Sequence, residues 1–372
     1  MARQERYAEY NCHYDRLKRR SIAQARKNGC EQRLADVARE PIQYAQGRDT
    51  AMTGLAAVIA AAVSWAVLGA LVRRAGLLPL DVPNARSLHV RAIPRGGGLA
   101  IWAGWIAGTL WLPGAKPWLG PLAAVIAVSL LDDLRGVHPA FRLTVHLAAA
   151  AAWVWLAGPA LNPIAAVLAI VWMANLYNFM DGSDGLAGTM AVVGFGAYAA
   201  AAWLAGSAAA TLFLALVAAV VPFLLRNAPP ARVLLGDVGA VPLGFLAAVF
   251  GITGWQERWW PAWFPILIFL PFIADATATL VYRLLRGARI WEAHREHYYQ
   301  RLVQIGWGHR RTLALYAGLM VGVAGSSLGV LAWAPAAGVV LLIVWTVVLA
   351  LIFAAIEYHW RRRGVGFEES KG

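Results

Sequence analysis

The stretch GLAAVIAAAVSWAVLGALV at residues 54–72 carries no charged side chain. A helix of about 20 apolar residues crosses the ~30 Å hydrocarbon core of a bilayer. Similar apolar runs recur as far as Tyr358 and leave no room for a soluble domain between them. Of the 372 residues, 60% are hydrophobic and 14% are charged, which is more apolar surface than a soluble protein of this length could bury. The sequence therefore predicts an integral membrane protein built of helices.

The apolar runs predict an all-α, polytopic fold of about eleven transmembrane helices on the length criterion. We expect the spans at residues 54–72, 97–113, 119–131, 141–157, 163–178, 186–204, 208–225, 238–253, 263–281, 312–333 and 336–358. An excess of Lys and Arg marks cytoplasmic loops. Here these residues fall on alternate loops, with only Lys116 and Arg258 on the other set. The pattern predicts an outside N-terminus and a cytoplasmic C-terminus, and it explains the net charge of +13 without nucleic acid as a partner.

Three regions are expected along the chain. Residues 1–51 are basic and polar, residues 52–363 form the transmembrane domain, and residues 364–372 form a cytoplasmic tail. An outside N-terminus would carry the positive segment across the membrane, which the charge rule disfavours. Two interpretations stay open: a mis-assigned start, with Met52 as the natural one, or a genuine extension that is disordered or amphipathic.

Acidic residues gather at the predicted cytoplasmic ends of the helices. They occur in SLLDDLRG (residues 129–136), NFMDGSDGLAG (178–188) and LLGDVGAVPLG (234–244). Hard oxygen ligands that converge from several segments suit Mg²⁺, which shares them with substrate phosphates. The spacing of Asn175, Asn178 and Asp181 by three sets them near one face of a helix end. For any one motif, a helix-end signal or an ordinary Asp-Gly turn remains the alternative.

Basic residues lie on two other cytoplasmic loops. Residues 282–312 mix Arg, His and aromatic side chains, which can bind a nucleoside diphosphate or lie on anionic headgroups; both interpretations stay open. Residues 81–101, DVPNARSLHVRAIPRGGGLAI, include Arg86, His89, Arg91 and Arg95. Their three glycines could cradle phosphate through backbone N–H groups, or the loop could simply be flexible. Arg142, at the start of a helix, could reach back to the carboxylates or be a topology marker.

As an ordered set, these motifs resemble the polyprenyl-phosphate N-acetylhexosamine-1-phosphate transferases, a group within glycosyltransferase family 4. The resemblance runs from about residue 54 to residue 311 and rests on DVPNARSLHVRAIPRGGGLAI, LLDDLRG, NLYNFMDGSDGLAG, LLGDVGAVPLG and EAHREHYYQRL. The first and last of these look most like the branch that initiates O-antigen or related surface polysaccharides.

The resemblance implies transfer of an N-acetylhexosamine-1-phosphate from a UDP-sugar to undecaprenyl phosphate, with release of UMP. It implies a bacterial inner-membrane enzyme whose active site lies on the cytoplasmic face. The implied partners are undecaprenyl phosphate, a UDP-N-acetylhexosamine and the lipid bilayer, and a homodimer is compatible with it. GlcNAc, QuiNAc and FucNAc differ by a hydroxyl group or its stereochemistry, so the sequence leaves the sugar open.

The resemblance also implies roles for individual residues. Asp237 would be the principal Mg²⁺ ligand with Asn178 beside it, and Mn²⁺ is the alternative ion. Asp132 and Asp133 match an aspartate pair, one member of which is proposed to deprotonate or orient the acceptor phosphate. Asp181 and Asp184 match a second acidic pair with a catalytic role. The substrate-binding positions would be Asn175, Arg142, His294, Arg295 and His297.

Two further classes compete with this interpretation. A transporter or flippase also uses intramembrane acids, but near the membrane midplane and often in inverted repeats. Here the acids sit at one edge and no repeat is evident. A phosphatase acting on lipid diphosphates would need no UDP-sugar. A transferase with a lipid acceptor predicts a groove between helices that opens sideways to the bilayer.

Overall fold

The structure is a computed structural model that describes residues 31–74, 78–83, 88, 91–114, 116–158, 162–289 and 294–362, with side chains from Thr50 onward. Arg86, His89 and the expected tail at 364–372 lie outside the described residues. The chain divides into two units, Met1–Gly54 and Leu55–Gly372. In the first unit, the described part of the expected extension is helical from Glu31.

Helices form nearly all the regular structure of the described residues. They are α2 (Glu31–Arg73), α3 (Gly98–Thr109), α4 (Leu119–Arg135), α5 (Pro139–Ala157), α6 (Pro163–Phe179), α7 (Leu186–Leu204), α8 (Ala209–Asn227), α9 (Asp237–Gln256), α10 (Trp263–Ile268), α11 (Leu270–Leu285), α12 (Tyr298–Leu302), α13 (Gly308–Trp333) and α14 (Gly338–Arg362). The two strands, β1 (Leu80–Asp81) and β2 (Ile93–Pro94), pair antiparallel. Over the residues that the structure describes, the fold is therefore all-α apart from this short hairpin.

Seven helical stretches of the described chain are long and apolar enough to cross a membrane. They are Thr50–Arg73, Pro139–Ala157, Leu186–Leu204, Ala209–Asn227, Asp237–Gln256, Tyr298–Trp333 and Pro335–Arg362. Helices α3 and α6 are shorter apolar helices. The other expected spans fall on α4 and on the pair α10–α11, which is interrupted at Phe269. The chain is a polytopic membrane protein.

Local sequence sets where several helices begin. Proline occupies the first position of α5 and α6, where its missing N–H has no helical partner to lose. The residue before each proline caps the helix: Asn162 Oδ1 accepts from the Ile164 N–H at 3.0 Å. Gly185 precedes α7 with φ of +76°, a conformation that favours glycine.

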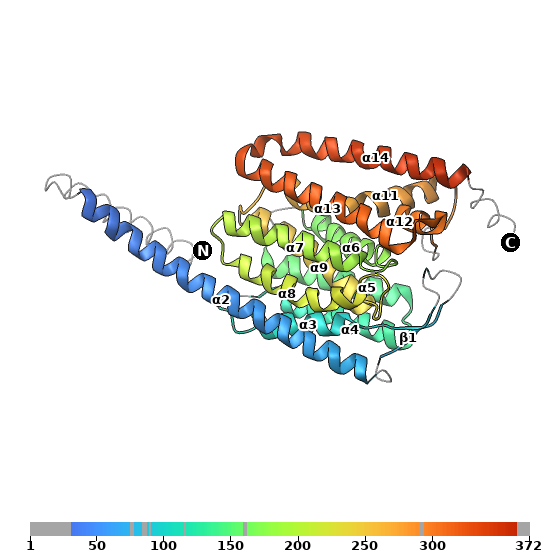
Figure 1. The fold of residues 1–372 in the computed structure, drawn as a ribbon, viewed down its shortest axis with the longest axis horizontal. Helices are drawn as coiled ribbons and strands as arrows, with labels where there is room; N and C mark the ends of the chain where they lie inside the picture. Colours follow the sequence, from blue (N-terminus) through green and yellow to red (C-terminus); the bar gives the residue numbers. More distant parts are fainter. Residues whose placement is uncertain are drawn as a thin grey trace. The chain divides into compact units, whose positions relative to one another are not determined.

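Helix α9 lies in the middle of the second unit, between α6 and α4 (Figure 1). Small residues let its backbone approach its neighbours, as in other membrane helix pairs. A Cβ atom added at Gly244 would lie 2.4 Å from the Met173 carbonyl oxygen of α6. One added at Gly98 of α3 would lie 2.3 Å from the Gly239 Cα of α9. These contacts fix the N-terminus of α9, where Asp237 lies.

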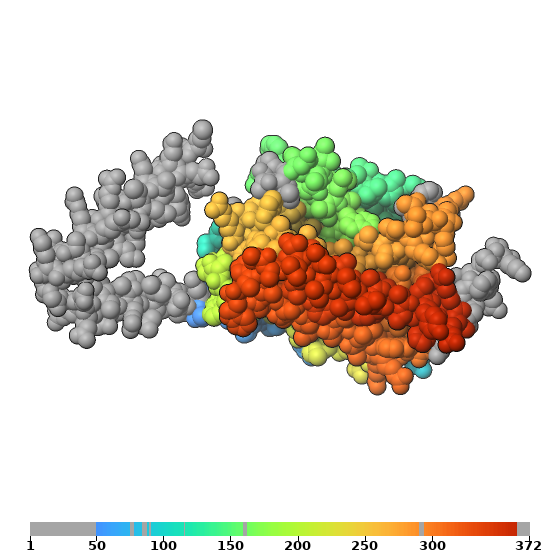
Figure 2. Space-filling view, turned by 90° about the horizontal axis from the view of Figure 1, so that it is seen from above, coloured from blue at the N-terminus to red at the C-terminus, as the bar shows by residue number. Residues whose placement is uncertain are grey.

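Helix α14 runs along one face of the second unit, as the red band in Figure 2 shows. Its outward residues are large and apolar, among them Val340, Ile343, Val347 and Leu351. Such a surface is expected on a helix that faces lipid, because lipid tails are as apolar as these side chains.

Candidate active site

A cavity of about 360 Å³ lies where four separate segments meet at one end of the helices. The segments are the β1–β2 hairpin, the turn after α6, the start of α9 and the residues around α12. Its lining consists of Asp81, Arg95, Asn178, Phe179, Asp181, Gly182, Leu234, Gly236, Asp237, His294, Tyr299 and Gln300. Four residues expected from the sequence therefore share one cavity: Asn178, Asp181, Asp237 and His294.

Asp133 holds the start of α9 in place. Its two carboxylate oxygens accept the backbone N–H groups of Asp237 at 3.1 Å and Val238 at 2.9 Å. The Arg95 Nε atom donates to the same carboxylate at 2.7 Å, and the Asp133 side chain is only 1% exposed. A carboxylate at a helix N-terminus stabilises the unpaired N–H groups there. Asp133 thus orients both Asp237 and Arg95.

Arg142 reaches back from α5 to the carboxylate cluster. Its Nη1 atom donates to Asp132 and, at 2.9 Å, to Asp237 Oδ2. Asp132 also accepts the Val137 N–H at 2.6 Å, across the turn between α4 and α5. One guanidinium therefore links two of the expected acids and lowers their mutual repulsion.

Asp181 lies in the turn that follows α6. Burial raises the pKa of its carboxyl group well above the usual range, and the negative charges of Asp237 and Asp133 raise it further. A cation placed among these acids would favour the charged form and lower that pKa. The turn therefore has the electrostatics of a site that gains from positive charge.

Three other expected residues lie outside the cavity lining. Asn175 donates from Nδ2 to the Val171 carbonyl oxygen at 2.7 Å, one turn earlier in α6. The Asp184 carboxylate accepts the Ala231 N–H at 2.9 Å and lies 3.6 Å from His309 Nδ1. Neither residue lines the cavity, and neither does Arg295, whose carbonyl oxygen accepts from Gln304.

The two histidines of the basic segment differ in position. His294 lines the cavity, and burial, with contributions from His297 and Arg283, lowers the pKa of its imidazole to about 4. His297 is buried, with ring centroids 6.0 Å from Phe179 and 5.9 Å from Tyr299 in stacked geometry. His294 is therefore a neutral hydrogen-bonding group at pH 7, and His297 is part of the wall behind the cavity.

The glycine loop, residues 96–98, does not bind an anion through its backbone N–H groups. The N–H groups of Gly96 and Gly97 donate to the Leu234 carbonyl oxygen, at 3.2 and 2.9 Å, and that of Gly98 donates to Leu235. Of the two interpretations left open for these glycines, the phosphate cradle is not supported, because these backbone donors are already used in packing the loop against the start of α9. The same packing forms a bridge between Arg95 and Leu234 and brings the Arg95 side chain into the cavity.

Four residues with polar side chains line the cavity and were given no role in the site from the sequence: Asp81, Arg95, Tyr299 and Gln300. All four lie in motifs identified from the sequence: Asp81 and Arg95 lie in DVPNARSLHVRAIPRGGGLAI, and Tyr299 and Gln300 lie in EAHREHYYQRL. The particular positions that face the cavity depend on the pairing of β1 with β2 and on the start of α12.

Residues 117–255, from before α4 to the end of α9, match the family model described as glycosyl transferase family 4. The chain belongs to this family. The matched residues include Asp181 and Asp237, which line the cavity. They also include Asp132 and Asp133, whose hydrogen bonds hold neighbouring groups in place. The match therefore spans the acidic half of the candidate active site.

Relatives of this family 4 protein carry informative names. The chain is 27% identical over 264 residues to a Bacillus subtilis (strain 168) protein named "Probable undecaprenyl-phosphate N-acetylglucosaminyl 1-phosphate transferase", covering 63% of this chain and 72% of the relative. It is 26% identical over 286 residues to the undecaprenyl-phosphate alpha-N-acetylglucosaminyl 1-phosphate transferase of Yersinia pestis, covering 67% and 77%. For the Escherichia coli (strain K12) protein of the same name, the identity is 25% over 293 residues, covering 70% and 77%.

The donor set of this family 4 protein fits a hard cation. Within the part of the chain that the structure describes, no three His, Cys, Asp or Glu side chains form a complete metal cage. The cavity does offer the carboxylates of Asp181 and Asp237 and the amide of Asn178. Mg²⁺ is commonly held by one or two carboxylates and completes its shell with water and substrate phosphates. The residues present therefore suit Mg²⁺ shared with a phosphate ligand.

Proposed function

We propose that the protein transfers an N-acetylhexosamine-1-phosphate from a UDP-sugar to undecaprenyl phosphate, releases UMP, and so initiates a lipid-linked surface polysaccharide of the O-antigen type. The observation that carries the proposal is the single cavity in which Asn178, Asp181 and Asp237 lie with Arg95 and His294, in a chain of glycosyl transferase family 4. The names of the relatives support the same kind of transferred group and the same acceptor.

The proposed reaction explains why acidic and basic residues share the cavity. An acceptor phosphate oxygen attacks the phosphorus that bears the sugar, the bond from that phosphorus to the bridging oxygen breaks, and UMP leaves with this oxygen. Both substrates are anions, so positive groups must offset their repulsion and the charge that develops at phosphorus. In this proposal Asn178, Asp181 and Asp237 hold Mg²⁺, which would neutralise charge on the donor diphosphate.

The protein's own groups have distinct parts in this scheme. Arg95 places a positive charge at the cavity while Asp133 fixes its guanidinium. His294, neutral at pH 7, offers a hydrogen bond to a phosphate oxygen without adding charge. Because Asp133 is occupied with α9, we assign Asp132, paired with Arg142, the role of orienting or deprotonating the acceptor phosphate.

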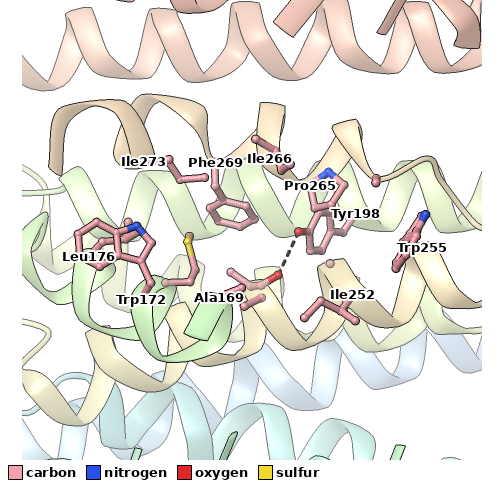
Figure 3. Close-up of a pocket in the computed structure, with 15 residues that line it drawn as sticks. Ala169, Trp172, Leu176, Tyr198, Ile252, Trp255, Pro265, Ile266, Phe269 and Ile273 are labelled. Atoms are coloured by element: carbon pink, nitrogen blue, oxygen red, sulfur yellow. Dashed lines mark hydrogen bonds between the residues drawn. The ribbon is translucent and has the colours of Figure 1, made fainter. Parts of the chain in front are cut away.

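The acceptor's isoprenoid tail has a candidate place beside this site. An apolar cavity of about 340 Å³ lies between α6, α9, α10 and α11, with Trp172, Leu176, Ile252, Ile266 and Phe269 among its walls (Figure 3). The hydroxyl group of Tyr198 in this wall donates to the Ala247 carbonyl oxygen at 3.0 Å. This hydroxyl group is therefore not an unpaired polar atom in contact with the tail.

The position of this groove fits a lipid substrate. Trp172 is 38% exposed and Ile266 is 45% exposed, so the lining reaches the outer surface of the bundle. At its other end, Leu176 precedes Asn178 on the same helix. An acceptor can thus keep its tail in the groove and in lipid while its phosphate meets the polar cavity. This arrangement supports the lateral groove expected from the sequence.

We also propose that the cavity faces the cytoplasm, with the N-terminus outside and about eleven crossings. The helix ends around the cavity carry Arg135, Arg226 and Arg283, whereas Lys116 and Arg258 lie at the opposite ends. Basic residues favour the cytoplasmic side.

The test is UMP release from the purified protein in detergent, with undecaprenyl phosphate, Mg²⁺ and a panel of UDP-N-acetylhexosamines. We expect release that requires lipid and metal together, and loss of release in Asp237→Asn. That substitution keeps the size of the side chain and removes its charge. Folded protein that releases no UMP with any donor in the panel would contradict the proposal.

A further inference from the structure

Tyr299 lies in the basic segment, residues 282–312, and contacts the turn between α6 and α7, residues 180–185, which we call the acidic turn. A single hydroxyl group makes this contact. This hydroxyl donates to the Phe179 carbonyl oxygen at 2.9 Å and accepts the Gly182 N–H at 3.1 Å. The two backbone groups lie on either side of Asp181, and Asn178 immediately precedes Phe179. One oxygen atom therefore closes the turn that presents both Asn178 and Asp181 to the cavity.

The backbone of Tyr299 is held in place by a buried carboxylate, that of Asp275. Its backbone N–H donates to Asp275 Oδ2 at 3.0 Å, and that of Tyr298 donates to Asp275 Oδ1 at 2.9 Å. Asp275 is fully buried in α11, and the hydroxyl group of Tyr316 in α13 donates to the same carboxylate. A buried carboxylate with this many donors holds its partners rigidly. Tyr299 therefore connects the acidic turn to α11 and α13.

We propose that Tyr299 is a positioning residue for the divalent cation: its hydroxyl group holds the turn so that the oxygens of Asn178 and Asp181 face Asp237. This inference rests on the proposed function. Ligand oxygens bind a cation tightly only when neighbouring hydrogen bonds fix their direction, and the loss of such a partner typically costs about 10- to 100-fold in metal affinity or activity. Tyr299 needs no contact with the substrate for this role.

The structure offers two independent ways to break the contact. Tyr299→Phe removes the hydroxyl group and leaves the ring that stacks on His297. Gly182→Ala acts from the other side, because a Cβ atom there would lie 2.3 Å from the Tyr299 oxygen and push it away. Gly182 does not have a positive φ, so alanine brings no backbone strain of its own.

The two substitutions should not be additive. In the double variant Gly182→Ala/Tyr299→Phe the oxygen that meets the new methyl group is absent. The nearest remaining atoms are Gln300 Nε2 at 3.2 Å, at the end of a flexible side chain, and Cζ of residue 299 at 3.3 Å. If both changes act by breaking the same contact, the second adds little to the first.

The experiment measures the rise in melting temperature of the full-length protein in detergent as Mg²⁺ is added in the presence of UMP. For both single variants, we expect the Mg²⁺ concentration of half-maximal stabilisation to rise by about 10- to 100-fold, with no larger rise in the double variant. Mg²⁺-dependent UMP release should shift by the same factor, while the KM for the UDP-sugar changes less.

Ser64→Ala is the matched control. The hydroxyl group of Ser64 is also fully buried and donates to a backbone carbonyl, that of Ala219, at 2.7 Å. Its removal should lower the melting temperature without Mg²⁺. It should leave the Mg²⁺ midpoint unchanged, since this bond lies between α2 and α8 and not across the acidic turn.

The outcomes separate this inference from the proposed function. If the wild-type protein responds to Mg²⁺ and both single variants respond at the same concentration, Tyr299 has only a structural role and the inference is overturned. If the wild-type protein shows neither stabilisation by Mg²⁺ nor UMP release, the proposed function fails and the inference falls with it.

Discussion

Asp132 and Asp133 are adjacent in sequence and have different partners. Asp133 accepts two backbone N–H groups from α9 and a guanidinium, whereas Asp132 shares Arg142 with Asp237. Arg142 is thus the link between the acid that we assign to the acceptor and the acid that we assign to the metal.

Removing the charge of Arg142 should leave these two acids to repel each other. For Arg142→Met, which keeps an unbranched chain, we expect kcat for UMP release to fall by about 10²- to 10³-fold, the usual cost of removing one preorganised charge-stabilising donor. Arg142→Lys keeps the charge without the fork of donors and should lose less. A kcat for Arg142→Met within two-fold of wild type would show that the bridge has no part in the reaction.

His294 allows a prediction about pH. Its pKa is about 4 in the folded protein and 6.5 in an ordinary environment, so the unfolded chain binds more protons between these values. This residue should therefore contribute a loss of stability as pH falls from 6.5 towards 4, while it has little effect above 6.5.

The measurement is the melting temperature in detergent between pH 7.5 and 4. His294→Gln cannot acquire this charge and should show a shallower decline than wild type, with His359→Gln at an exposed position of α14 as the control. Parallel declines for His294→Gln and wild type would contradict a depressed pKa at His294.

At the scale of elements, the position of α9, which begins at Asp237, depends on glycines that let it pack closely against its neighbours. At Gly244 the Met173 carbonyl oxygen of α6 stands 2.4 Å from the place of a Cβ atom, and Ala174 Cα stands 2.8 Å away. Backbone atoms cannot move aside as the end of a side chain can. Close packing of α9 on α6 therefore depends on this residue.

Gly244→Ala should force α9 away from α6. We expect a loss of about 1–3 kcal/mol, the usual cost of overpacking a well-packed core, measured by denaturation in detergent. Gly196→Ala in α7 is the matched control, because no atom lies within 4 Å of its Cβ position. It should be neutral or stabilise the helix by about 0.5–1 kcal/mol. Equal stabilities for the two variants would contradict the packing argument.

The elements differ in how far the sequence could predict them. Hydropathy places the apolar helices well, since crossing a bilayer depends on local composition: the expected span at 186–204 coincides with α7. The convergence of Asn178, Asp181 and Asp237 also follows from motifs at the same ends of helices. The turn at Asp184 does not, because whether its carboxylate meets the cavity or the Ala231 N–H depends on the path of a distant loop. The bridge of Arg95 to Leu234 is equally non-local.

At the scale of the whole molecule, a change in the apolar groove should affect binding of the lipid acceptor only, because the UDP-sugar has no isoprenoid tail. Ala248 lines the groove. Ala248→Trp should fill it and raise the KM for undecaprenyl phosphate about ten-fold or more, while the KM for the UDP-sugar stays within two-fold. A tryptophan side chain brings roughly 200 Å² of surface, enough to occupy much of such a groove.

A second apolar cavity supplies the control for this prediction. It lies between α5 and α6 and is lined by Ala151 among others. Ala151→Trp adds the same bulk at an exposed position of α5 and should leave both KM values unchanged. If Ala248→Trp raised the KM of the UDP-sugar and not that of the lipid, the tail would have to lie elsewhere.

Because the groove opens sideways to the bilayer, the relevant concentration of the lipid acceptor is its density in the membrane and not its concentration in the bulk solution. An acceptor that enters from the bilayer meets the enzyme by diffusion in a plane, so the encounter rate follows the number of acceptor molecules per unit of membrane area. Added detergent or inert phospholipid should then slow the reaction at constant bulk acceptor, by surface dilution, whereas the water-soluble donor obeys ordinary volume concentration. In a cell, the rate would respond to the share of the membrane that the carrier lipid occupies.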